Sequence, residues 1–172
     1  LGLRTAFNLL GPLTNPAGAS RQVVGVPTPE LTGLMAHVLR LLGTERAWVV
    51  HGADGVDEVS THGYTKVAEC RDGHVHTFYI HPTDFGIAKS EPGSLAGGDA
   101  PMNAAIIRGV LDGRTGPARD VVLLNAGVGL LVAGVVPSVV AGVEQAAAAI
   151  DHGTAAKTLA TMVRYSREGA EA

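Results

Sequence analysis

Residues 47–60 read AWVVHGADGVDEVS, and in this stretch a buried strand ends and a loop rich in carboxylates begins. Its opening aromatic and β-branched run is typical of a buried strand, and the run stops at His51 and Gly52, where glycine allows the chain to turn. Asp54, Asp57 and Glu58 follow closely in the loop. Because ligand sites of open α/β sheets lie at the carboxyl ends of strands, the stretch predicts both the fold class and a candidate site.

Two interpretations of these three carboxylates are open at this point. Oxygen ligands suit a hard cation such as Mg²⁺, which keeps several waters and takes one or two carboxylates together with substrate phosphates. Acidic loops are also common as solvated turns that bind nothing. The spacing of the carboxylates does not separate a metal site from a solvated turn.

The segments on either side of this stretch predict an α/β fold with a mostly parallel sheet and flanking helices. Residues 22–26 form an apolar strand, and residues 29–42 carry apolar side chains at helical spacing. A helical crossover of this length between two strands implies that the strands are parallel. After the acidic loop, residues 64–69 and 75–80 alternate around Asp72 and Gly73, which indicates a hairpin.

The last part of the chain predicts a run of helices. We expect them at residues 100–111, 120–135, 138–150 and 154–166. Asp99 should cap the first of these helices, and its apolar residues should face inward: Ile106, Ile107, Val110 and Leu111. The apolar run at 121–136 carries Asn125 and is too short and too polar at its middle to span a membrane comfortably, so it predicts a buried core helix.

Composition excludes several classes of function. The chain has 172 residues, is 46% hydrophobic and has a formal net charge of −3, so it can bury a full core and has no basic patch for nucleic acid or a membrane surface. Its one cysteine, Cys70, cannot form an internal disulfide, which favours a cytoplasmic location. The sequence begins at Leu1 without an initiator methionine, and we expect it to be a fragment.

Four segments together resemble, in order and spacing, the C-terminal half of the anthranilate phosphoribosyltransferase family. They are GLRTAFNLLGPLTNPA (2–17), VHGADGVDEVS (50–60), GGDAPMNAAIIRGVLDG (97–113) and GPARDVVLLNAGVGLLVAG (116–134). The resemblance implies a two-domain enzyme with a small helical domain and a larger α/β domain, assembled as a homodimer. Residues 1–19 would be a helix end and hinge loop at the boundary of the helical domain, and residues 20–172 an α/β domain that lacks its N-terminal half.

The resemblance also implies an activity and assigns roles to four residues. The family transfers the 5-phosphoribosyl group from phosphoribosyl pyrophosphate to the amine of anthranilate, with Mg²⁺. Asp57 and Glu58 match the adjacent Asp-Glu pair that serves the metal, which favours the metal-site interpretation and leaves Asp54 as a turn residue. Gly11 and Pro12 match loop positions that line the entry for the aromatic acid. No residue of the chain is assigned as a catalytic acid, base or nucleophile.

Two alternatives to this activity stay open. The family's phosphate-holding loop and its Lys-His-Gly-Asn segment belong to the N-terminal half and do not occur here. The chain could therefore be a truncated α/β module without activity, or a relative in the same superfamily with a different acceptor. If the other half is absent, an apolar face of the sheet should be left uncovered, and the isolated chain should self-associate.

Overall fold

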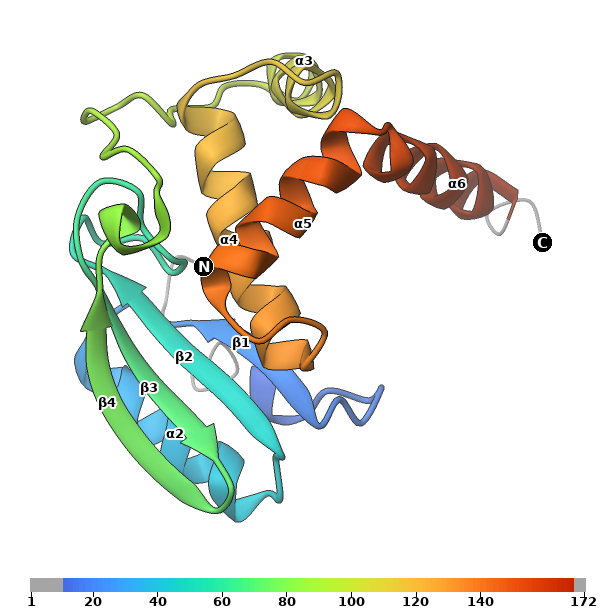
Figure 1. Ribbon diagram of the computed structural model, residues 1–172. Coiled ribbons are helices and arrows are strands. Elements are labelled where there is room, and N and C mark those ends of the chain that lie inside the picture. Colours follow the sequence, from blue (N-terminus) through green and yellow to red (C-terminus); the bar gives the residue numbers. More distant parts are fainter. Residues whose placement is uncertain (1–10, 169–172) are drawn as a thin grey trace.

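The computed structural model describes residues 11–168 and shows an α/β arrangement in which helices lie on both faces of one sheet (Figure 1). The four strands lie in the order in which they occur along the chain. They are β1 (Arg21–Gly25), β2 (Arg46–Gly52), β3 (Thr65–Arg71) and β4 (His74–Ile80). The predicted α/β class is confirmed. The helix end expected within residues 1–10 lies outside the described residues.

The sheet is mixed, so the expectation of a mostly parallel sheet is wrong for the described strands. Only β1 and β2 pair in parallel there, while β2–β3 and β3–β4 are antiparallel. The parallel pair is joined through helix α2 (Glu30–Leu41), as the crossover predicts. The connection from β2 to β3 is the acidic loop alone, and a chain that reverses through a loop returns as an antiparallel strand. The predicted hairpin is confirmed, with Asp72 and Gly73 both at positive φ.

Strand β2 is buried on both faces because its side chains alternate between two hydrophobic clusters. Ala47 and Val49 pack with α2 on one face. Trp48 and Val50 belong to the cluster on the other face, which α4 (Pro117–Ala133) and α5 (Val139–Asp151) complete. Successive side chains of a strand point to opposite faces of the sheet, and in β2 both sets are buried because neither face meets solvent.

The remaining helices are α3 (Ala100–Leu111) and α6 (Thr154–Glu168), with short 3₁₀ turns η1 (Gly11–Leu13) and η2 (Pro82–Phe85). The predicted cap of α3 is confirmed, because an Asp99 carboxylate oxygen accepts a hydrogen bond from the Met102 N–H at 2.9 Å. The expectation that Ile107 faces inward is wrong, since this side chain is 53% exposed. Periodicity placed both Ile107 and Val110 on the apolar face of α3, but only Val110 packs into the buried cluster with Leu123 of α4 and Ile150 of α5.

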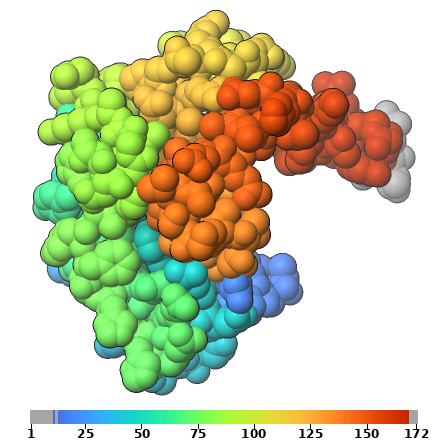
Figure 2. All heavy atoms as spheres, viewed as in Figure 1, coloured from blue at the N-terminus to red at the C-terminus, as the bar shows by residue number. Residues whose placement is uncertain are grey.

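Helix α6 reaches out from the body of the molecule (Figures 1 and 2) and buries none of its residues. Helix α4, which contains the apolar run predicted to be a core helix, has Leu124 and Val128 fully buried. Over residues 11–168, no helix combines the length and apolar character needed to cross a membrane.

Candidate functional site

The acidic loop lies at the carboxyl edge of the only parallel strand pair in the described sheet. It leaves β2 after Gly52 and enters β3 at Thr65. Directly beside it, β1 ends at Gly25, and the Val26 N–H continues the ladder to the Val50 carbonyl at 3.0 Å. The carboxyl edge of parallel strands is where open α/β sheets bind ligands, so the loop occupies the expected position.

Glycine allows the loop to lie this close to the sheet. A Cβ atom at Gly25 would overlap the backbone carbonyl of Asp57, so no larger residue fits there without a shift of the loop. Within the loop, the Gly55 N–H donates to the Gly52 carbonyl at 2.9 Å, and Gly55 adopts a positive φ of 86°. Asp54 therefore sits in a tight turn, as predicted from the sequence, while Asp57 and Glu58 follow it on an exposed bend.

The charged form of the Glu58 carboxyl is disfavoured in the folded chain. Partial desolvation raises the pKa of the Glu58 carboxyl, and the charges of Asp57 and Asp54 raise it further. The family resemblance leaves Asp54 outside the Asp-Glu pair, but in the structure its charge acts on the Glu58 carboxyl. A bound cation would relieve the repulsion that now disfavours the charged form of Glu58.

The donor set of this loop fits Mg²⁺ held in part by a substrate. Within residues 11–168, no group of three or more His, Cys, Asp or Glu side chains is arranged to hold a metal ion by itself. Mg²⁺ commonly takes only one or two carboxylates, keeps several waters and completes its shell with phosphate oxygens. Asp57 and Glu58 supply hard oxygen ligands of that number at an exposed position.

A polar pocket of about 300 Å³ lies next to the acidic loop, lined in part by Asp54, His62 and Ser90. His62 Nδ1 lies 2.9 Å from the Ser90 carbonyl, and the Thr61 and Ser90 hydroxyls are 2.9 Å apart. These bonds tie the end of the acidic loop to the segment that follows η2. No local sequence pattern predicts this pocket, because its walls come from loops almost thirty residues apart.

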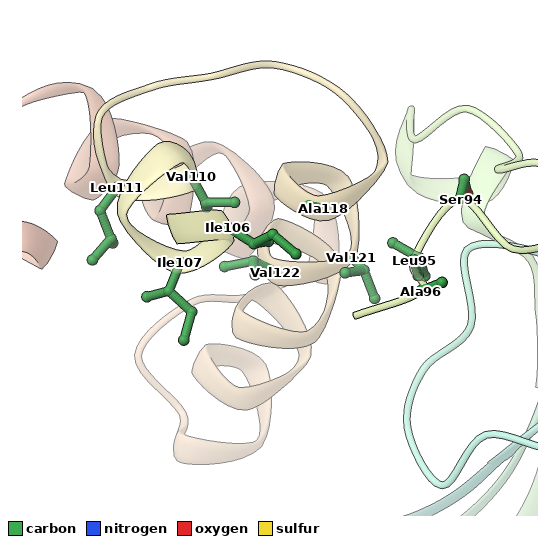
Figure 3. Close-up of a pocket in the computed structure, with 10 residues that line it drawn as sticks. All are labelled: Ser94, Leu95, Ala96, Ile106, Ile107, Val110, Leu111, Ala118, Val121 and Val122. Atoms are coloured by element: carbon green, nitrogen blue, oxygen red, sulfur yellow. The ribbon is translucent and has the colours of Figure 1, made fainter. Parts of the chain in front are cut away.

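A larger pocket, of about 350 Å³, opens between α3 and α4 (Figure 3). Figure 3 shows Ile106 and Val110 from α3 and Val121 from α4 beside Leu95 of the preceding loop. Its lining contains no charged side chain, so it does not suit a phosphate group. Leu95 also lines the polar pocket beside the acidic loop, which makes the two pockets neighbours.

Gly11 and Pro12 lie in the 3₁₀ turn η1, ahead of the loop that leads to the start of β1. Gly11 is exposed, and its carbonyl accepts a hydrogen bond from the Thr14 N–H at 3.3 Å within the same turn. The acidic loop lies at the other end of β1, beside Gly25. The role of Gly11 and Pro12 in binding an aromatic acid stays a prediction.

Two histidines, His74 and His76, lie two positions apart on β4. His74 and His76 are both exposed, and their ring centroids are 6.4 Å apart. No group of three possible ligands includes them in the part of the chain that the structure describes.

Comparison with known proteins identifies the class of protein to which this fold and loop belong. The model of the glycosyl transferase family, a/b domain, matches residues 1–156, and the chain belongs to this family. Among curated proteins it is similar to the anthranilate phosphoribosyltransferases of Azorhizobium caulinodans, at 52% identity over 167 residues, and of Caulobacter vibrioides, at 54% identity over 163 residues. These alignments cover 97% and 95% of the chain but 48% of each relative. The chain thus spans about half the length of the curated relatives it matches.

Solved structures give the same result. Anthranilate phosphoribosyltransferase from Thermus thermophilus superposes with a TM-score of 0.87 at 41% identity, covering 96% of this chain and 49% of the other. The Saccharomyces cerevisiae enzyme in complex with PRPP and Mg superposes with a TM-score of 0.80 at 30% identity, over 92% of this chain and 46% of the other. The resemblance to the C-terminal half of these enzymes, noted from four sequence segments, is confirmed.

Proposed function

We propose that this chain supplies the magnesium-binding carboxylates of an anthranilate phosphoribosyltransferase. The observation that carries the proposal is the position of Asp57 and Glu58, adjacent on an exposed loop at the carboxyl edge of β1 and β2. Identities of about 50% to enzymes of this name over nearly the whole chain support it. The substrates would be phosphoribosyl pyrophosphate and anthranilate, and the cofactor Mg²⁺.

In phosphoribosyl transfer, the carboxylates of Asp57 and Glu58 would act by holding the metal ion. As the bond to pyrophosphate breaks, negative charge collects on the leaving group while the ribose carbon becomes cationic. When bound, Mg²⁺ neutralises charge on the leaving pyrophosphate. Asp57 and Glu58 would hold the metal on its protein side and thereby orient the pyrophosphate against the sheet edge. Gly11 and Pro12 would line the entry for the planar aromatic acid.

The same proposal includes the domain organisation, the assembly and the location. Residues 1–19 would form the boundary to a helical domain, and residues 20–172 part of the α/β domain. The assembled enzyme would be a homodimer in the cytoplasm, without nucleic-acid or membrane partners. Analytical ultracentrifugation of a fusion that restores the N-terminal half would distinguish a dimer from a monomer.

The experiment uses a fusion in which this chain replaces the matched segment of the Azorhizobium caulinodans relative. Loss of anthranilate fluorescence in the presence of phosphoribosyl pyrophosphate and Mg²⁺ reports turnover. We expect the fusion to be active, and the double variant Asp57→Asn with Glu58→Gln to lose roughly 100-fold or more of kcat/KM, because charge on the leaving group is no longer neutralised.

The matched control is Asp72→Asn, which removes an exposed carboxylate from the β3–β4 turn, where asparagine also tolerates the positive φ of 51°. This variant should keep the activity of the parent fusion. A folded parent fusion without turnover would contradict the proposal and favour either an inactive module or another acceptor. Testing other aromatic and heterocyclic amines with the same fusion separates those two outcomes.

A further inference from the structure

The structure restrains the backbone of the Asp57–Glu58 pair at two points. The first is within the pair, because the Asp57 carbonyl, in the peptide bond that joins the two residues, packs directly against Gly25 of β1. The second is directly after the pair, where Val59 is buried with 1% exposure in the cluster that contains Leu124 and Val128 of α4. The two carboxylates are therefore exposed side chains on a backbone that is held between them and immediately after them.

Asn125 of α4 makes the contact with Val59, the second of these two points. Its Oδ1 accepts a hydrogen bond from the Val59 N–H at 2.9 Å, and its Nδ2 donates to the Val59 carbonyl at 2.9 Å. The second hydrogen of Nδ2 serves the Val121 carbonyl at 3.0 Å, one turn earlier in the same helix. Asn125 and Val59 are 66 positions apart, so only the packing of α4 on the sheet brings them together.

The two backbone groups of Val59, its N–H and its carbonyl, explain why position 125 carries an amide side chain. Asparagine is a poor helix former, and the neighbours Leu124 and Val128 are apolar, so a leucine would suit both helix and core better. A side chain that satisfies the N–H and the carbonyl of one residue must both accept and donate. Aspartate of the same size cannot donate, and leucine can do neither, which would leave two backbone groups unpaired.

We propose that Asn125 is a positioning residue for the Asp57–Glu58 pair. By fixing the backbone of the residue directly after Glu58, it sets where the two carboxylates can meet a divalent cation carried with a phosphorylated substrate. The inference deepens the proposed function and rests on it for the substrate. Groups that orient metal ligands without touching the metal typically change metal affinity or activity by roughly 10–100-fold when replaced.

The test compares Asn125→Leu with Asn103→Leu in the fusion described above. Asn103 is a matched control because it makes the same pair of bonds, from the Gly98 N–H and to the Gly98 carbonyl, both at 2.9 Å, but beside α3 rather than the acidic loop. Binding of Mn²⁺, a paramagnetic substitute for Mg²⁺, is measured by electron paramagnetic resonance. We expect Asn125→Leu to weaken Mn²⁺ binding roughly 10-fold or more, and Asn103→Leu to change it less than twofold.

Kinetics provide a second readout. If Asn125 positions the ligands, the Mg²⁺ concentration for half-maximal rate should rise by a larger factor than kcat at saturating Mg²⁺ falls.

Should Asn125→Leu not fold, Asn125→Ala removes the same bonds with a smaller side chain. Hydrogen exchange of residues 53–64 in the unsubstituted fusion, which should slow when Mg²⁺ is added, requires no variant. A folded variant with unchanged Mn²⁺ affinity, or unchanged exchange on adding Mg²⁺, would overturn the proposal.

The two proposals can fail separately. Turnover of anthranilate tests the proposed function, whereas Mn²⁺ affinity tests the role of Asn125. A parent fusion that binds Mn²⁺ but does not use anthranilate would count against the acceptor alone, and the Asn125 comparison would still decide the positioning role. A folded parent fusion that binds no Mn²⁺ would overturn the positioning role as well.

Discussion

Glu58, which we propose as a metal ligand, lies where the folded chain disfavours the charged form of its carboxyl. Its pKa is raised in the folded chain by desolvation and by the charges of Asp57 and Asp54. A carboxyl whose pKa is higher when folded binds protons more tightly in the folded state. The tighter proton binding of Glu58 therefore stabilises the folded state fully at pH values below its ordinary pKa, near 4.5. This stabilisation is lost as the pH rises through the higher pKa of the folded chain. Residues at ligand sites are commonly less favourable for folding stability than other residues would be at the same positions.

The variant Glu58→Gln should therefore be more stable than the parent at pH 8, and the difference should shrink towards pH 4. Because Glu58 is exposed and solvent screens its charge, we expect a rise in Tm of no more than about 2 °C. Thermal unfolding of the fusion without divalent cations, followed by circular dichroism, measures the effect. A variant less stable than the parent at pH 8, or a difference independent of pH, would contradict this account of Glu58.

At the scale of the elements, the backbones of α4 and α5 lie in close contact where two glycines meet. A Cβ atom at Gly142 of α5 would lie 2.5 Å from the Gly127 carbonyl oxygen of α4 and 2.7 Å from its Cα. Both partners are backbone atoms, so no side chain can rotate away to make room. This crossing holds the helix that carries Asn125, and thereby connects helix packing to the acidic loop.

Gly142→Ala should destabilise the fold by about 1–3 kcal/mol, since it forces the two helices apart. The matched change is Gly33→Ala in α2, where nothing lies within 4 Å of the added Cβ. There alanine should stabilise by about 0.5–1 kcal/mol through its better helix propensity. Urea unfolding of the fusion gives both values. Equal effects of the two substitutions would show that the crossing does not limit the approach of α4 and α5.

On the scale of the whole molecule, the apolar surface left open lies on α3, α4, α5 and α6, and not on a face of the sheet as the sequence led us to expect, because α2 covers one face of the sheet and α4 and α5 cover the other. Leu111 lines three pockets on this surface, and the pockets extend along it from the α3–α4 groove to α6. Ile107 and Val122 are exposed there, at 53% and 42%. Contiguous apolar surface of this kind usually marks an interface. Because the relatives are about twice as long, the rest of such a protein is available to cover it.

We expect the isolated 172-residue chain to self-associate through this surface, and the fusion to give one defined species. Multi-angle light scattering over a range of protein concentrations measures both. The variant Ile107→Lys with Val122→Lys should reduce self-association, while Leu41→Lys on the exposed side of α2 should not. A monodisperse monomer of the unsubstituted chain would contradict the prediction.

The sequence by itself determined the local features of this protein. Strand and helix positions, the Asp99 cap, the hairpin at Asp72 and the carboxylates at the end of β2 follow from periodicity and turn chemistry, which depend on near neighbours. Four ordered motifs also identified the family. Only the tertiary structure decided the mixed sheet, the exposure of Ile107 and the contact between Asn125 and Val59. These features depend on which distant segments pack together, and no local pattern specifies that choice.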